Sequence, residues 1–177
     1  MSQKSNLICL TIIGTFLPSL VMSVQYHTYP DDSTVLVALG FAGLESPYGF
    51  LNSVEILDFA NETVCSTSDA LYKTEGSVGV LLKETKNVAM FCGGFDGDNF
   101  EYRNECQSLH NNETWTQSPS LVKSFRRDAA LVQFAHGILV TGGFPSDSSI
   151  EFFDGQAWNL LKTKLPNGLY GHCAVSL

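Results

Sequence analysis

Apolar residues occur along the chain in short runs that end in glycine. Three such runs occupy positions 35–40, 88–94 and 138–143, and the second and third end in a pair of glycines. Short runs rich in Val, Ile, Leu and Phe and bounded by turn residues predict β-strands. No long stretch shows the 3.6-residue period of an amphipathic helix. The pattern therefore predicts an all-β chain.

The same order of segments follows each of these strands. A polar loop leads to a second strand, a tight turn leads to a third strand that opens with a large apolar residue, and a further loop leads to a fourth strand. The second strands are expected at 52–57, 104–109 and 148–153, the third strands at Val64, Trp115 and Trp158, and the fourth strands at 77–82, 129–134 and 173–177. Gly93 and Gly142 are 49 residues apart. Four short strands in a period of about 50 residues indicate a repeat protein.

This repeat resembles the kelch repeat of β-propeller proteins. The features in common are the glycine pair that ends an apolar strand, a Ser-Val-Glu or Ser-Ile-Glu second strand, and a downstream Trp. They are carried by Gly93, Gly94, Gly142, Gly143, Ser53-Val54-Glu55, Ser149-Ile150-Glu151, Trp115 and Trp158. The resemblance covers approximately residues 33–177, in units 33–72, 73–123 and 124–171 followed by a lone strand. It implies a kelch-type β-propeller of about three four-stranded blades.

Three blades make an incomplete ring, because propellers have typically 4–8 blades. In the family, strands from the two chain ends pair in one blade, so the lone strand 173–177 is a candidate to complete the first blade. The chain is therefore expected to be a partial propeller, either a truncated product or a fragment of a full one. The glycines are expected to allow positive φ and close packing of the innermost strands. Trp115 and Trp158 are expected to pack between blades.

The first residues predict a secretory signal peptide over 1–23. Lys4 supplies a positive charge, residues 7–22 are mostly apolar, and Val21-Met22-Ser23 offers a cleavage site. A membrane anchor is the alternative, but the apolar run is short and Pro18 lies near its end. A short segment, 24–32, precedes the repeats. We expect a secreted protein with no membrane span after signal removal.

Composition limits the partners. The chain is 44% hydrophobic and 16% charged with a formal net charge of −8, which fits a packed core. An acidic chain is a poor nucleic-acid binder, because such binding requires a basic surface. The basic cluster Lys123, Arg126 and Arg127 is interpreted as a solvated loop.

Four cysteines remain after signal removal, namely Cys65, Cys92, Cys106 and Cys173. Four cysteines allow three disulfide connectivities, and sequence alone does not select one. Alignment of the repeats favours Cys92–Cys106, because the two residues lie on adjacent antiparallel strands at similar distances from the hairpin tip. Cys65 and Cys173 then either pair with each other or leave Cys173 with a partner elsewhere. The alternative is that Cys92 is a small buried core residue.

Two N-glycosylation sequons begin at Asn61 and Asn112, in equivalent turns of successive units. A turn outside the core is accessible to the transferase. We expect glycans at both residues.

No catalytic, cofactor or metal site is predicted. The four histidines lack metal-ligand spacing. The stretch Asp96-Gly97-Asp98-Asn99 departs from the EF-hand pattern and is interpreted as an acidic turn, with weak cation binding as the alternative. Galactose oxidase-like enzymes share the fold that the resemblance implies, but no set of catalytic residues can be assembled from spacing here.

The favoured hypothesis is a non-enzymatic, secreted module that binds another protein. Kelch propellers bind through loops at one end, which here implies loops 96–103, 118–127 and 145–149. The candidate contact residues are Phe95, Phe100, Tyr102, Arg126 and Phe144. The alternative is an extracellular carbohydrate binder or an inactive relic of a galactose oxidase-like kelch enzyme.

Overall fold

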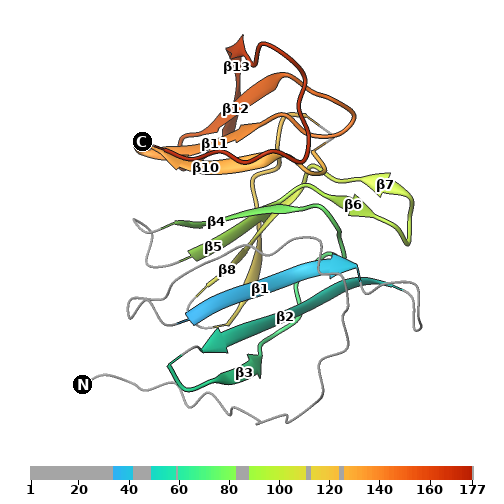
Figure 1. The fold of residues 1–177 in the computed structure, drawn as a ribbon, viewed down its shortest axis with the longest axis vertical. Helices are drawn as coiled ribbons and strands as arrows, with labels where there is room; N and C mark the ends of the chain where they lie inside the picture. Colours follow the sequence, from blue (N-terminus) through green and yellow to red (C-terminus); the bar gives the residue numbers. More distant parts are fainter. Residues whose placement is uncertain are drawn as a thin grey trace.

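The computed structural model describes residues 34–41, 49–58, 60–82, 88–110, 113–123 and 126–176. This part of the chain contains thirteen strands and no helix, so the prediction of an all-β chain is confirmed for it (Figure 1). It accordingly contains no helix that is long and apolar enough to cross a membrane.

The strands form three larger antiparallel sheets and one small hairpin. The first sheet joins β1 (Thr34–Phe41), β2 (Phe50–Asp58) and β3 (Thr63–Ser66). The second sheet joins β4 (Val78–Leu82), β5 (Val88–Cys92), β8 (Cys106–Leu109) and β9 (Trp115–Ser118). The third sheet joins β10 (Ala130–Phe134), β11 (Gly137–Thr141), β12 (Ser149–Phe153) and β13 (Trp158–Lys164). The hairpin pairs β6 (Phe95–Asp96) with β7 (Glu101–Tyr102).

The strands predicted within units 33–72, 73–123 and 124–171 number three, four and four, and this order is confirmed, but the predicted final strand is not. Residues 173–176 form no strand and do not join the first sheet, which has three strands. The hairpin β6–β7 was not predicted either, because the acidic stretch after Phe95 was interpreted as a simple turn. This hairpin protrudes from the second sheet (Figure 1).

The three large sheets are stacked, and a hydrophobic cluster fills each of the two junctions between neighbours (Figure 1). One cluster combines residues of the first and second sheets, including Leu36, Ile56, Phe91 and Leu109, with Trp115 packed against it. The other combines residues of the second and third sheets, including Val78, Met90, Val140, Phe153 and Trp158. The expectation that both tryptophans pack between sheets is therefore confirmed.

The glycine pairs mark the places where the chain crosses from one sheet to the next. Gly93 and Gly94 have φ of 68° and 105°. A Cβ on Gly93 would lie 2.4 Å from the carbonyl oxygen of Arg126, and the N–H of Gly94 donates to that oxygen at 3.0 Å. Gly143 likewise donates to the carbonyl of Leu169 at 2.7 Å. The expectation that these glycines adopt positive φ is confirmed. The expectation that they allow inner strands to pack closely is wrong, because the backbone that lies closest to Gly93 belongs to the crossing connection.

The two ends of the stacked sheets carry different loops. Because neighbouring strands are antiparallel, loops 93–105 and 142–148 lie at one end, together with the connections between sheets, and the turns after β2, β8 and β12 lie at the other. The first of these is called the loop end and the second the turn end below. Asn61 is exposed in a turn at the turn end, whereas Asn112 lies outside the described residues.

Candidate binding site

The loop end brings together segments that are far apart in the sequence. The connection between the first and second sheets pairs with β6 through the bridge between Glu75 and Phe95. The next connection pairs in the same way with the loop after β11, through Arg127 and Phe144. Each glycine-ended loop is thus joined to the connection that leads into its own sheet, while its glycine pair bonds to the next connection along the chain. Loops 93–105 and 142–148 therefore share one surface at the loop end.

A row of aromatic rings runs across this surface. The ring centroids of Phe95 and Tyr102 are 5.1 Å apart, those of Tyr102 and Phe144 are 5.8 Å apart with planes inclined by 18°, and those of Phe144 and Tyr170 are 5.8 Å apart. We call these four residues the aromatic row. The exposed fraction is 36% for Phe144 and 56% for Tyr170. Phe100, at the tip of the hairpin, is 82% exposed and is not part of the row.

Charged side chains hold the hairpin that carries two of these rings. Arg103 donates to the Asp96 carboxylate through Nε at 3.2 Å and also through Nη2, and its Nη1 lies 3.3 Å from Glu105. The Arg103 guanidinium stands 4.9 Å from the ring centroid of Tyr72. Burial raises the pKa of Asp96, but the hydrogen bonds from Asn99 and Arg103 outweigh it and hold this pKa below its ordinary value.

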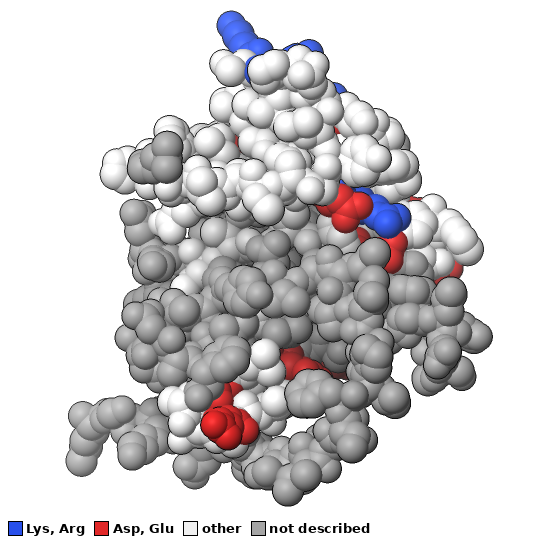
Figure 2. Space-filling model, viewed as in Figure 1, with Lys and Arg blue, Asp and Glu red and all other residues white. Residues whose placement is uncertain are grey.

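A second basic residue flanks the row. Arg127 Nη1 lies 3.0 Å from Glu75, and its guanidinium stands 5.7 Å from the ring centroid of Phe95. Lys73 and Asp98 form an exposed ion pair at 3.5 Å. Acidic and basic side chains meet at the right-hand edge of Figure 2, close to where Figure 1 places β6 and β7. The aromatic row is thus bordered by charges of both signs.

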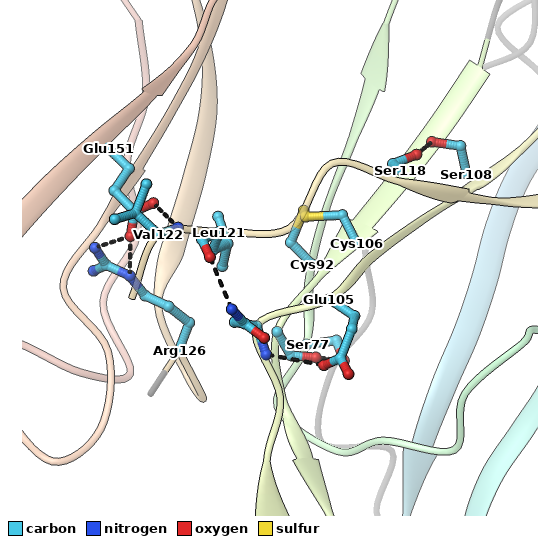
Figure 3. Close-up of a disulfide and its surroundings, with 12 residues drawn as sticks. Ser77, Cys92, Glu105, Cys106, Ser108, Ser118, Leu121, Val122, Arg126 and Glu151 are labelled. Carbon is cyan, nitrogen blue, oxygen red and sulfur yellow. Dashed lines mark hydrogen bonds and ion pairs between the residues drawn. A yellow bond between two sulfur atoms is a disulfide. The ribbon is translucent and has the colours of Figure 1, made fainter. Parts of the chain in front are cut away.

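Arg126, predicted as a binding residue and as part of a solvated loop, is fully buried, so both interpretations are wrong. Its Nη2 donates to Glu151 Oε1 at 2.8 Å and to Ser149 Oγ at 2.7 Å. The other Glu151 oxygen accepts from the backbone N–H of Val122 at 2.6 Å, as Figure 3 shows. A polar loop with basic residues suggested a solvated surface, but the charge of Arg126 is neutralised inside the junction.

The Cys92–Cys106 disulfide is present, with the two Cα atoms 4.1 Å apart (Figure 3). The two residues are directly opposite in the pairing of β5 with β8. The bridge closes the base of loop 93–105, which carries Phe95 and Tyr102. Cys173 has a free, exposed thiol, so the alternative pairing of Cys65 with Cys173 is wrong.

The remaining sequence signals give structural roles. The Asp96 carboxylate accepts hydrogen bonds from the backbone N–H of Asp98 and Asn99 and from the Asn99 side chain, so local bonds organise this acidic stretch. No cluster of three or more His, Cys, Asp or Glu residues with metal-binding geometry occurs in the described part of the chain. His172 bonds to Thr141 Oγ1 at 2.9 Å, and burial lowers its pKa.

Sequence reasoning placed Phe95, Tyr102 and Phe144 correctly on one surface but missed several of their neighbours. Tyr72, Arg103 and Tyr170 were not singled out. A usable signal existed, because Glu75, Arg127 and Tyr170 hold the same place in three successive connections.

Comparison with known proteins supports the fold alone. No protein-family profile matches the chain, and no curated protein matches it. Among solved structures, the chain is similar to the one described as the structure of YjhT, with a TM-score of 0.66 and 15% sequence identity. The match covers 79% of this chain and 52% of that chain. The chain thus spans about half the length of the structure that it matches.

Proposed function

We propose that the chain is part of a kelch-type β-propeller and acts, outside the cell, as a non-enzymatic module that binds another protein. The three large sheets correspond to three blades, of which the first lacks one strand. Support comes from the strand order, the repeated glycine pairs, and the equivalent contacts at the two junctions between sheets. The match to about half of a longer solved chain agrees with a partial ring.

The observation that carries the binding role is the aromatic row. Aromatic side chains supply large contact area at low entropic cost and are enriched at protein interfaces. Tyr170 is more than half exposed although it packs against Phe144, and Arg127 and Arg103 are held in place beside the row by carboxylates. An apolar centre with a fixed polar rim is the general arrangement of a protein-binding surface.

Residence outside the cell is supported by the disulfide, since disulfides form and persist in oxidising compartments. The signal peptide and the sequons point the same way. N-terminal sequencing of protein recovered from culture medium should begin at Val24. Recovery only from the cytosol with Met1 intact would contradict secretion.

The binding role is tested with a panel of purified extracellular domains and a glycan array. The unmodified chain is compared with Tyr170→Ser and Tyr102→Ser, and with Leu160→Ser as a control. Leu160 is 46% exposed on β13, away from the aromatic row. We expect at least one protein of the panel to bind, and each Tyr variant to weaken that binding by about tenfold or more while the control does not, since interface aromatics commonly contribute over 1 kcal/mol.

Two outcomes would overturn the proposal. Protein binding that both Tyr variants leave intact would place the site elsewhere. Binding to glycans alone, abolished by the same variants, would replace the protein partner by a carbohydrate. Thermal unfolding of each variant shows whether it is folded.

A further inference from the structure

The third sheet has one face that is built like an inter-sheet face but has no sheet against it. On the second sheet, Val78, Cys92 and Cys106 lie opposite one another on three neighbouring strands. On the third sheet, the residues at the same register positions are Ala130, Thr141 and Ile150, in that order. By the same register, Val80, Leu82 and Met90 correspond to Val132, Phe134 and Leu139. The second-sheet residues face the third sheet, whereas their counterparts lie on the opposite face of β10–β12.

The exposure of the two faces differs accordingly. Met90 is 3% exposed in the existing junction, and Cys106 is completely buried. Their counterparts Leu139 and Ile150 are only half-buried, and Phe134 is 52% exposed. We call this face, made by Val132, Phe134, Leu139, Ile150 and Phe152, the outer face of the third sheet.

The chain after β13 already follows the path of an inter-sheet connection. Leu165 donates to the carbonyl of Ser148 at 2.8 Å, as Leu121 does to that of Asn104 at 2.8 Å. Gly171 donates to the carbonyl of Asp128 at 2.7 Å. At the previous junction the equivalent bond runs from the N–H of Asp128 to the carbonyl of Gly76 at 2.8 Å, just before the chain enters the third sheet. The outer face therefore comes with the connection that elsewhere leads to a following sheet.

The first sheet has the complementary face. Gln107 and Glu151 hold the same position in the second and third sheets, and each receives two backbone N–H groups from the arriving connection. The corresponding residue of the first sheet is Glu55, which is exposed. Beside it on the same face are Leu57 and Val64, and Val64 is 41% exposed.

Side-chain sizes across these two faces are arranged in the opposite sense to those at the existing junction. At the existing junction, Leu82 of the second sheet packs against the cluster to which Trp158 of the third sheet belongs, so the third sheet supplies the larger residue. Phe134 stands in the place of Leu82, and Val64 stands in the place of Trp158. Phe134 against Val64 would reverse which of the two sheets supplies the larger side chain.

We propose that the outer face of the third sheet docks the first sheet of a second copy of this chain, and that two copies close head to tail into a six-sheet ring. A head-to-tail contact closes when the rotation permits, and six lies within the 4–8 blades of known propellers. The match to 52% of a longer chain agrees, since the matched parts of two copies would together have about the length of that single chain. The pairing rests on the propeller fold proposed above but not on the aromatic row.

The test is the oligomeric state of the chain purified from culture medium, measured by light scattering and sedimentation over a range of concentrations. We expect the mass of two copies. Phe134→Lys and Val64→Glu should each shift the protein to the mass of one copy at concentrations where the unmodified chain is paired. Leu71→Lys, which changes a 48% exposed residue outside both faces, is the matched control and should remain paired.

Mixing the two variants distinguishes this arrangement from others. In a mixed pair, the lysine introduced by Phe134→Lys meets the glutamate introduced by Val64→Glu at one junction, and two unmodified faces meet at the other. Pairing should therefore return on mixing. An unmodified chain with the mass of one copy at all concentrations would overturn the proposal. Pairing that is insensitive to Val64→Glu, or that mixing does not restore, would also overturn it. A chain that stays monomeric but binds a protein through Tyr170 would overturn the pairing and leave the proposed binding function intact. A chain that pairs but binds no protein of the panel would support the pairing and contradict the binding function.

Discussion

Gln107 and Glu151 occupy the same position in two successive sheets and make the same contact. Gln107 Oε1 accepts from the N–H groups of Leu71 and Tyr72 at 2.7 and 3.3 Å, and Glu151 accepts from those of Val122 and Lys123 at 2.6 and 3.1 Å. One junction uses a neutral amide and the other a carboxylate. The difference follows from the residue in the connection between the sheets. Arg126 in the second connection requires a carboxylate beside it, whereas the equivalent residue of the first connection is the neutral Thr74.

The first prediction concerns this exchange of a charged pair for a neutral one. Arg126→Thr leaves a buried carboxylate without its cation, and Glu151→Gln leaves a buried guanidinium without its main partner. Each single change should lower the free energy of unfolding by about 3–5 kcal/mol. The double variant reproduces the residues of the first junction and should cost clearly less than the sum of the two. Urea unfolding measures all four proteins, and additive losses would contradict the coupling.

The second prediction concerns the disulfide at the base of loop 93–105. The positions of Cys92 and Cys106 are held in the first sheet by Ala38 and Val54, so Cys92→Ala with Cys106→Val is a matched apolar replacement. Losing a bridge that closes 14 residues should cost about 3 kcal/mol. Amide exchange in the loop that carries Phe95 should also accelerate. Cys173→Ser is the control, since its thiol is free and exposed, and an equal loss in the control would refute the explanation.

The third prediction concerns the glycine at the crossing point. Gly93→Ala should be strongly destabilising, because the new Cβ would lie 2.4 Å from the Arg126 carbonyl oxygen in addition to the strain of positive φ. Gly155→Ala is the control, because Gly155 has a φ of 97° but no atom within 4 Å of the added Cβ. The control should show only the backbone strain, about 1–2 kcal/mol. Thermal unfolding measures the stability of both variants. If both lose a similar amount of stability, close contact with the crossing connection at Gly93 contributes nothing beyond backbone strain.

The fourth prediction concerns acid. Burial of Asp96 opposes ionisation, but hydrogen bonds from Asn99 and Arg103 lower its pKa below the ordinary value. A carboxyl whose folded pKa is lowered stabilises the fold above its unfolded pKa of about 4, and this stabilisation is lost as the pH falls through the folded value. The protection factors of the β6–β7 amides, which correct for the intrinsic pH dependence of exchange, should therefore fall below about pH 4. Asp96→Asn should exchange faster at neutral pH and lose that dependence; a hairpin equally protected in both proteins would argue against this role.

The fifth prediction concerns glycans. Asn61 lies in an exposed turn at the turn end, where the transferase can reach it. Secreted protein should lose two glycan masses on glycosidase treatment, and Asn61→Gln and Asn112→Gln should each remove one. Secreted material whose mass does not change on treatment would be the contrary result. Asn61→Gln should not affect binding by the aromatic row, which lies at the opposite end of the sheets from Asn61.

The sequence predicted the strands because their signals are local. Each apolar run, turn and glycine is readable within a few residues, and the repeat then confirmed the order. The disulfide could be predicted for the same reason, since aligned repeats place Cys106 on the strand beside Cys92. The pairing of the two cysteines depends on the register of their strands, and the alignment of the repeats predicts that register.

Other features depend on contacts between distant residues and could not be read in this way. Arg126 is the clearest example, because its partner Glu151 lies on a strand of the next sheet, and nothing near Arg126 in the sequence indicates burial. A carboxylate between Ile150 and Phe152 in a predicted strand was the available sign that a buried cation is required. Likewise Tyr170 joins the aromatic row only because its connection follows the path of the two before it.

The crossing of each glycine pair by the next connection has a consequence for how the molecule unfolds. Since Gly94 is bonded to Arg126 and Gly143 to Leu169, the glycine-ended loop of one sheet cannot complete its backbone hydrogen bonds until the chain that follows that sheet is in place. Neighbouring sheets should therefore melt as coupled pairs, with a nearest-neighbour cooperativity like that of linear repeat arrays. Damage at one crossing should then propagate to the adjacent sheet before it reaches the far side of the molecule.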